Sequence, residues 1–197
     1  GMENPSMAPL AVYGARRGFR LQGASMIDTL VEARTDSYCG RSMSATSDHL
    51  ARDFGITRAA HDAYALLSQR RAHDAQKSGR LGEEIVAVEV SRRGRTVTIA
   101  EDDHLRPDTT AESLATLRPA FGPDSFVTAG NASGIVDGGA AVVMAAERWA
   151  RSREIAPLGR VVAWAVVGVD PSRRGIGPVP ATRAARANAG WGLADVD

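Results

Sequence analysis

The sequence predicts an α/β fold of which only a part lies within these 197 residues. Its first half has the patterns of a long helix and a hairpin, and its second half alternates apolar strands with helices. Alternation of strand and helix is typical of a parallel α/β layer, in which strands need neighbouring strands. The few strands expected here cannot make such a sheet alone, so we expect further strands outside the given sequence.

The first half is expected to be irregular chain followed by helices. Glycines and prolines interrupt residues 1–45 repeatedly, which is typical of a segment that packs on something else. A short helix is expected at 46–54, with Thr46 as its cap. A longer helix is expected at 57–78, because Thr57 can cap it and apolar residues recur along it at helical spacing.

A hairpin and a short helix complete the first half. Residues 84–90 alternate between polar and apolar side chains, and residues 96–99 repeat the pattern after a turn at 91–95. A short helix is expected at 111–117, because Thr110 can serve as its N-cap.

The second half carries the remaining expected strands. Residues 126–128 predict a short strand, residues 140–145 a nearly all-apolar strand, and residues 158–169 a long valine-rich strand. A helix is expected to follow the second of these strands as far as Arg153, and another is expected at 180–189.

Composition excludes several classes of function. The chain is 44% hydrophobic and 24% charged with a net charge of +1, which is typical of a soluble globular protein and gives no reason to expect nucleic acid or a membrane as partner. Cys39 is the only cysteine, so an intramolecular disulfide is impossible, which fits a reducing cytoplasm. The four histidines show no metal-ligand spacing, and no apolar run has the length of a membrane span. We therefore expect a cytoplasmic protein without a metal.

Four blocks of the sequence resemble the thiolase family, and they occur in the family's order. They are residues 1–9 (GMENPSMAP), 117–121 (LRPAF), 127–134 (VTAGNASG), and the pair 169–171 (VDP) and 175–181 (GIGPVPA). The resemblance extends over essentially the whole chain. It implies an incomplete thiolase fold, in which an inserted loop domain is followed by parts of the two βαβαβαββ core halves.

The resemblance also implies a division into domains. Residues 1–133 match the loop domain, residues 134–157 the end of the N-terminal half, and residues 158–197 the start of the C-terminal half. Within the loop domain, residues 10–28 match the segment through which many thiolases form tetramers. A homo-oligomer, dimer or tetramer, is therefore expected.

Thiolases are acyl-CoA C-acyltransferases that make or cleave β-ketoacyl-CoA in lipid and fatty acid metabolism by Claisen chemistry, using two cysteines. Acyl-CoA is their substrate, and no prosthetic group is implied. The blocks that carry the two cysteines and the Gly-His-Pro segment are not in this sequence. Cys39 falls in irregular sequence, with Arg41 as the nearby cation, at a position where the family usually has an aromatic residue. We therefore assign no catalytic residue and expect the chain to be inactive alone. The alternative is a non-catalytic CoA-binding or oligomerisation module, and flanking coding sequence would discriminate the two.

The resemblance places a CoA site on specific residues. Ser133 matches a serine that contacts the pantetheine arm, and the alternative is that its loop is a structural turn between two strands. Arg106 matches an arginine that lies along the nucleotide, although it could equally be an exposed charge. By composition alone, Phe121 and Met43 are as easily core residues. The matching positions are Met43, Arg106, Ser113, Ala120, Phe121, Ala129, Ser133 and Ile135.

Four positions depart from the family pattern. Ser42 replaces a histidine, Arg34 an apolar residue, Val136 an asparagine, and Arg174 a methionine near the active site. A charge near an apolar acyl pocket is costly unless it is paired. Either the parent enzyme uses an acyl group with a polar end, or the sequence is decaying as a truncated gene.

Overall fold

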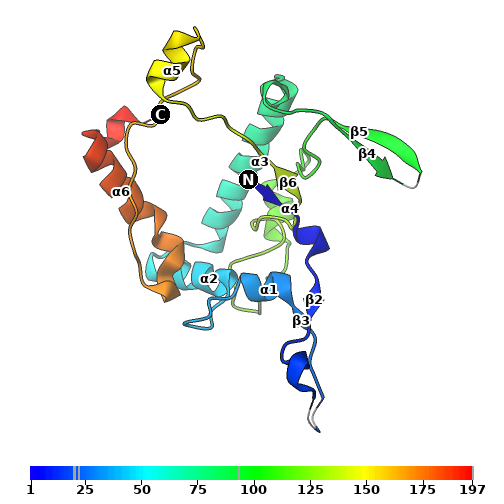
Figure 1. Ribbon diagram of the computed structural model, residues 1–197. Coiled ribbons are helices and arrows are strands. Elements are labelled where there is room, and N and C mark those ends of the chain that lie inside the picture. Colours follow the sequence, from blue (N-terminus) through cyan, green and yellow to red (C-terminus); the bar gives the residue numbers. More distant parts are fainter. Residues whose placement is uncertain (20, 22, 93, 197) are drawn as a thin grey trace. The chain divides into compact units, whose positions relative to one another are not determined.

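The computed structural model describes residues 1–19, 21, 23–92 and 94–196 as mixed helix and sheet (Figure 1). Within those residues, all strand pairing is antiparallel and each sheet has two strands. The chain divides into two compact units. One unit is Ala51–Ile135, and the other combines Gly1–Leu50 with Val136–Asp197.

The unit Ala51–Ile135 is built on the long helix α3 (Arg58–Lys77). Thr57 caps this helix as predicted, because its side chain accepts a hydrogen bond from the Ala60 N–H at 3.2 Å. The shorter helix α4 (Ala111–Ala115) contacts α3, and the side chains of Leu66 and Leu114 are buried. These helices form the main body of the unit.

The predicted hairpin is also in this unit and is confirmed with shifted bounds. Strand β4 (Val88–Arg92) pairs with β5 (Arg95–Ile99) from Val88↔Ile99 to Arg92↔Arg95. The expected turn includes Arg93, which lies outside the described residues. The short 3-10 helix η3 (Leu81–Glu83) precedes the hairpin. Thr110 caps α4 as predicted, in a reciprocal capping box with Ser113.

The other unit is made of short elements. Strand β1 (Met2–Glu3) pairs with β6 (Gly138–Gly139), and β2 (Leu10–Ala11) pairs with β3 (Ile27–Asp28). Positions 20 and 22 of the segment 10–28 lie outside the described residues. The helical elements that lie wholly in this unit are α1 (Thr29–Ala33), α5 (Glu147–Ser152), α6 (Pro178–Ala189), η1 (Pro5–Met7), η2 (Ala15–Arg17), η4 (Pro171–Ile176) and η5 (Leu193–Asp195).

The short helix expected at 46–54 is confirmed as α2 (Met43–Asp53), but its cap was assigned wrongly. Ser42, and not Thr46, accepts a hydrogen bond at the start of the helix, from the Ala45 N–H at 3.2 Å. Thr46 is buried inside the helix, and its hydroxyl donates to the Ser42 carbonyl. A serine and a threonine four residues apart both satisfy the capping preference, so the sequence pattern could not separate them.

The three strands predicted in the second half are wrong as strands within the described residues. At 126–128 only an isolated bridge forms, between Thr128 and Pro119. No described residue of the segments 140–145 and 158–169 is in a strand, although Ala140 exchanges two hydrogen bonds with Gly1 next to the β1–β6 pair. Val143 and Val166 are 94% and 87% exposed. The reason is physical: a strand exists only when another strand takes up its backbone hydrogen bonds.

Asp137 ties the amino-terminal segment to the β6 region. Its carboxylate accepts hydrogen bonds from the Ser6 hydroxyl and, at 3.0 Å, from the Ser6 N–H. These bonds lower the pKa of Asp137 below the ordinary 3.8. A lowered pKa means that the tie is complete above about pH 4 and is lost as the pH falls through the lowered value.

We therefore expect the chemical shift of the Ser6 amide to stay constant down to about pH 4 and to change below it. An acid titration followed by NMR measures this transition. Asp137→Asn removes the titrating group, so the transition should vanish in that variant. An unchanged midpoint in Asp137→Asn would contradict the assignment.

Candidate functional site

The loop at 126–134, which matches the thiolase block VTAGNASG, is folded back on Thr128. The Thr128 side chain is 0% exposed, and its hydroxyl accepts the Gly130 N–H at 3.2 Å. The Thr128 carbonyl accepts the Asn131 and Ala132 N–H groups at 3.3 and 3.1 Å. The loop therefore has a fixed backbone before it reaches Ser133, which is exposed.

The glycines of this loop are needed for packing inside the protein. A Cβ on Gly130 would lie 2.4 Å from Leu114 Cδ2 and 2.5 Å from Leu117 Cδ1. A Cβ on Gly134 would lie 2.2 Å from His104 Cε1. Small residues here thus let side chains of the same unit approach the loop backbone. The close packing at Gly130 and Gly134 supports the interpretation of the loop as a structural turn. Ser133 is nevertheless exposed.

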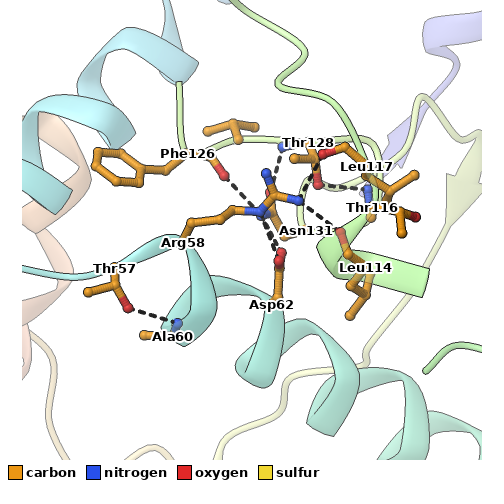
Figure 2. A network of polar contacts seen from close by, with 12 residues as sticks. Thr57, Arg58, Ala60, Asp62, Leu114, Thr116, Leu117, Phe126, Thr128 and Asn131 are labelled. Carbon is orange, nitrogen blue, oxygen red and sulfur yellow. Dashed lines mark hydrogen bonds and ion pairs between the residues drawn. The ribbon is translucent and has the colours of Figure 1, made fainter. Parts of the chain in front are cut away.

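An ion pair lies beneath the loop at the start of α3. Arg58 Nε is 2.8 Å from Asp62 Oδ2 (Figure 2). The same guanidinium donates from one terminal nitrogen to the carbonyls of Leu114 and Leu117, at 2.8 and 3.0 Å. Leu114 lies in α4 and Leu117 lies two residues beyond its end, and the Leu114 carbonyl also accepts the Leu117 N–H at 3.1 Å. Arg58 therefore joins α3 to the end of α4.

Asn131 joins the loop to the same ion pair. Its Nδ2 donates to Asp62 Oδ1 at 2.9 Å and to the Phe126 carbonyl at 3.0 Å (Figure 2). Its Oδ1 accepts the Thr128 N–H at 2.8 Å. Arg58, Asp62 and Asn131 are not among the site residues predicted from the sequence. The i, i+4 spacing of Arg58 and Asp62 on a predicted helix was the available signal, whereas the link to Asn131 spans 69 positions.

Most of the predicted CoA residues lie in the unit Ala51–Ile135, and Met43 lies in the other unit at the start of α2. All of them are exposed. In particular Phe121 is 61% and Met43 53% exposed, so the alternative that these two are core residues is wrong for this chain. The residues in the unit Ala51–Ile135 are Arg106, Ser113, Ala120, Phe121, Ala129, Ser133 and Ile135.

Backbone pairing brings part of this set together. The Ala120 N–H donates to the Val127 carbonyl at 2.9 Å, and Pro119 bridges to Thr128. Ala120 and Phe121 therefore run beside the beginning of the loop that carries Ala129. Among the described residues, Arg106 forms no such bridge. Its backbone N–H donates instead to Gln69 Oε1 of α3 at 3.0 Å.

Ser113 is committed to the cap of α4. Its hydroxyl accepts the Thr110 N–H at 3.0 Å and donates to the Thr110 carbonyl at 2.9 Å. A hydroxyl that has donated its one proton can still accept a hydrogen bond from a ligand. Ser113 can therefore contribute an acceptor to a site without leaving the cap.

Cys39 lies in a turn between α1 and α2 that is organised by a carboxylate. Asp36 Oδ1 accepts the N–H groups of Tyr38 and Cys39, each at 2.9 Å. The hydrogen bond from the Cys39 backbone is the main cause that lowers the pKa of Asp36, and the charge of Arg174 lowers it further. The sequence analysis missed Asp36, and with it the negative charge beside Cys39.

Arg174 and Arg41 each face an acidic group in the same unit. The charge of Arg174 lowers the pKa of Asp36. The pKa of Asp170 is lowered mainly by the hydrogen bond from the Ser172 hydroxyl, and the charge of Arg41 adds to this effect. The positive charge of Arg174 therefore has the negative charge of Asp36 near it, which reduces the free-energy cost of an arginine at this position. Nothing in the structure explains the departures at Arg34 and Val136.

One pocket among the described residues is lined by no predicted site residue. This pocket of about 350 Å³ lies between residues 160–163 and α6 and has a mostly apolar lining. Within the part of the chain that the structure describes, no three metal-ligating side chains are grouped together. Over the same residues, none of the helices combines the length and the apolarity that a membrane crossing requires.

Comparison with known proteins places the chain. Residues 1–148 match the family model of the thiolase N-terminal domain. Acetyl-CoA acetyltransferase of Rhizobium meliloti (strain 1021) is 44% identical over 198 residues, and the probable acetyl-CoA acetyltransferase of Escherichia coli (strain K12) is 43% identical. Each alignment covers 100% of this chain and 50% of the relative, so the chain spans about half the length of the curated relatives it matches.

Solved structures give the same result. The Bacillus anthracis acetyl-CoA acetyltransferase matches with a TM-score of 0.96 at 41% identity, covering 100% of this chain and 50% of that one. Human mitochondrial 3-ketoacyl-CoA thiolase in complex with CoA matches with a TM-score of 0.92 at 41% identity, covering 100% of this chain and 49% of that one. These matches confirm the predicted fold class, an incomplete thiolase fold of mixed helix and sheet. The chain belongs to the thiolase family.

Proposed function

We propose that this chain is the CoA-holding part of a thiolase-type acyl-CoA C-acyltransferase, acting in Claisen condensation or thiolysis of β-ketoacyl-CoA. The observation that carries the proposal is the match of the whole chain, at a TM-score of 0.92, to a thiolase that was solved with CoA. The exposure of every matching CoA position supports it, because a ligand can reach these side chains.

Within this proposal each residue has a limited role. Ser133 offers a hydroxyl to the pantetheine arm, and Arg106 offers a cation to the nucleotide phosphates. Ser113 offers an acceptor, and exposed Phe121 and Ile135 offer apolar surface. The residues of this chain bind and orient the thioester, and none of them is assigned a bond-making step. Acyl-CoA is the substrate, and the protein is proposed to be a cytoplasmic homo-oligomer of fatty acid metabolism that requires no prosthetic group.

The second candidate is a non-catalytic CoA-binding or oligomerisation module. The observation that favours it is the position of Cys39, whose backbone N–H donates to the Asp36 carboxylate at 2.9 Å. Both candidates bind CoA through the same residues. They differ in whether thiolase chemistry is completed by another polypeptide segment.

Titration calorimetry with CoA and with pantetheine tests the site. We expect weak binding of CoA, in the high micromolar to millimolar range, which corresponds to about 4–6 kcal/mol. Arg106→Ala should weaken binding of CoA but not of pantetheine, and the loss should be larger at low salt, where charge is less screened. Ser133→Ala should weaken both ligands.

Arg95→Ala is the matched control, because Arg95 is an exposed arginine of the same unit that lies on the hairpin. It should leave both affinities unchanged. No binding at millimolar CoA, or equal effects of Arg106→Ala and Arg95→Ala, would reject the site.

A further inference from the structure

We propose that Asp62 and Asn131 are positioning residues for CoA, which hold the exposed Ser133 loop in its binding conformation without touching the ligand. This inference rests on the proposed function of the loop. Its basis is the buried polar network at the start of α3, in which Asp62 is 7% exposed and accepts from both Arg58 and Asn131.

Both donor hydrogens of the Asn131 side-chain amide are used. They go to Asp62 Oδ1 and the Phe126 carbonyl, while the amide oxygen accepts the Thr128 N–H. Phe126 and Thr128 are backbone partners on the incoming arm of the loop. One side chain therefore closes the loop and anchors it to α3.

Arg58 extends the same anchor to the helix that carries Ser113. Its guanidinium bonds Asp62 on one side and the Leu114 and Leu117 carbonyls on the other. The two segments that carry Ser133 and Ser113 are thus tied to a single carboxylate. A substitution at Asp62 or Asn131 should therefore shift the exposed residues Ser133 and Ser113, although the bonds of the network go to other residues.

The network predicts different effects for a single substitution of nearly equal size and for the matching double substitution. Asn131→Asp removes both donors and sets a carboxylate against Asp62, which is repulsive in a buried site. In the double variant Asp62→Asn/Asn131→Asp, the amide at 62 can donate to the carboxylate at 131 and accept from Arg58. The bond to the Phe126 carbonyl is then lost, and the Arg58–Asp62 ion pair becomes a hydrogen bond to a neutral amide. The double variant should therefore recover part of what the single variant loses.

The test uses the full 197-residue chain at a temperature where far-UV circular dichroism shows each variant to be folded. We expect Asn131→Asp to weaken CoA binding by at least about tenfold, the factor that corresponds to 1.4 kcal/mol. The Gly130 and Ala132 amides, which are bonded within the loop, should exchange with deuterium faster. The swapped double variant should return both values toward wild type. Asp74→Asn, an exposed aspartate on the same helix, is the control and should change neither.

A double-mutant cycle separates positioning from general stability. If Asn131 acts through the loop, Ser133→Ala should cost less affinity in the Asn131→Asp background than in wild type, because the hydroxyl is already displaced. Additive losses would overturn the inference, as would faster loop exchange with unchanged affinity. If Asn131→Asp does not fold, Asp62→Asn provides the same cycle. Absence of CoA binding by the wild type would overturn the proposed function, whereas unchanged loop exchange in Asn131→Asp would overturn the network's role by itself.

Discussion

Thiolysis of acetoacetyl-CoA by the 197-residue chain is expected to stay at the uncatalysed rate, and Cys39→Ser is expected to leave that rate unchanged. Claisen chemistry of this family uses two cysteines, and these residues contain one. Removing one member of a catalytic set usually lowers the rate by several orders of magnitude. The effect relative to a complete thiolase should therefore be the largest of any described for this chain.

The surroundings of Cys39 strengthen this expectation. A cysteine nucleophile acts as a thiolate, which is favoured by a helix N-terminus or a neighbouring cation. The N–H of Cys39 is directed at the Asp36 carboxylate, and that carboxylate is held in its charged form by the turn and by Arg174. The group that the Cys39 N–H contacts is thus an anion, and neither a cation nor a helix N-terminus.

The assay follows the loss of acetoacetyl-CoA absorbance, with an acetyl-CoA acetyltransferase relative as the positive control. The same assay is repeated in an Asp36→Asn background. This variant removes the negative charge beside Cys39 but keeps a side-chain oxygen that can accept the hydrogen bonds of the turn. It therefore tests whether that charge is what keeps Cys39 inactive. The expected result is no activity in either background. A rate above the uncatalysed one that Cys39→Ser abolishes would show that Cys39 is a nucleophile.

Local interactions explain why the helices could be predicted. Thr57 and Thr110 cap α3 and α4 with their own side chains within three residues, so the signal and the structure lie in the same short stretch. The valine-rich segment at 158–169 has an equally clear strand pattern. It is not a strand among the described residues, because strand formation depends on partners far away in the sequence. The sequence pattern shows that the segment is able to form a strand, and the presence of a neighbouring strand decides whether the strand forms.

The candidate site divides in the same way. The resemblance selected Ser133 and its loop as candidates, and in the structure the loop is compact and Ser133 is exposed. The support beneath the loop depends on a contact between Asp62 and Asn131, which no local pattern encodes. An asparagine in a small-residue loop resembles a turn former, and only the fold reveals that both of its donor hydrogens and its oxygen are hydrogen-bonded.

Large apolar side chains are exposed on the segments 140–145 and 158–169. Val142, Val143 and Val166 are 87%, 94% and 87% exposed. Such side chains favour association, because each Å² of apolar surface that is buried contributes roughly 25 cal/mol.

We therefore expect the 197-residue chain to associate in solution, with a mass by light scattering above 20.8 kDa that rises with concentration. The double variant Val143→Asp/Val166→Asp should shift the distribution toward the monomer, because it places charge on the segments 140–145 and 158–169 and charged residues block edge pairing. Val86→Asp is the control: Val86 is 83% exposed but lies in the other compact unit, outside these segments. A monodisperse monomer at high concentration would contradict the expectation. Equal effects of the double variant and the control would show that association uses a different surface.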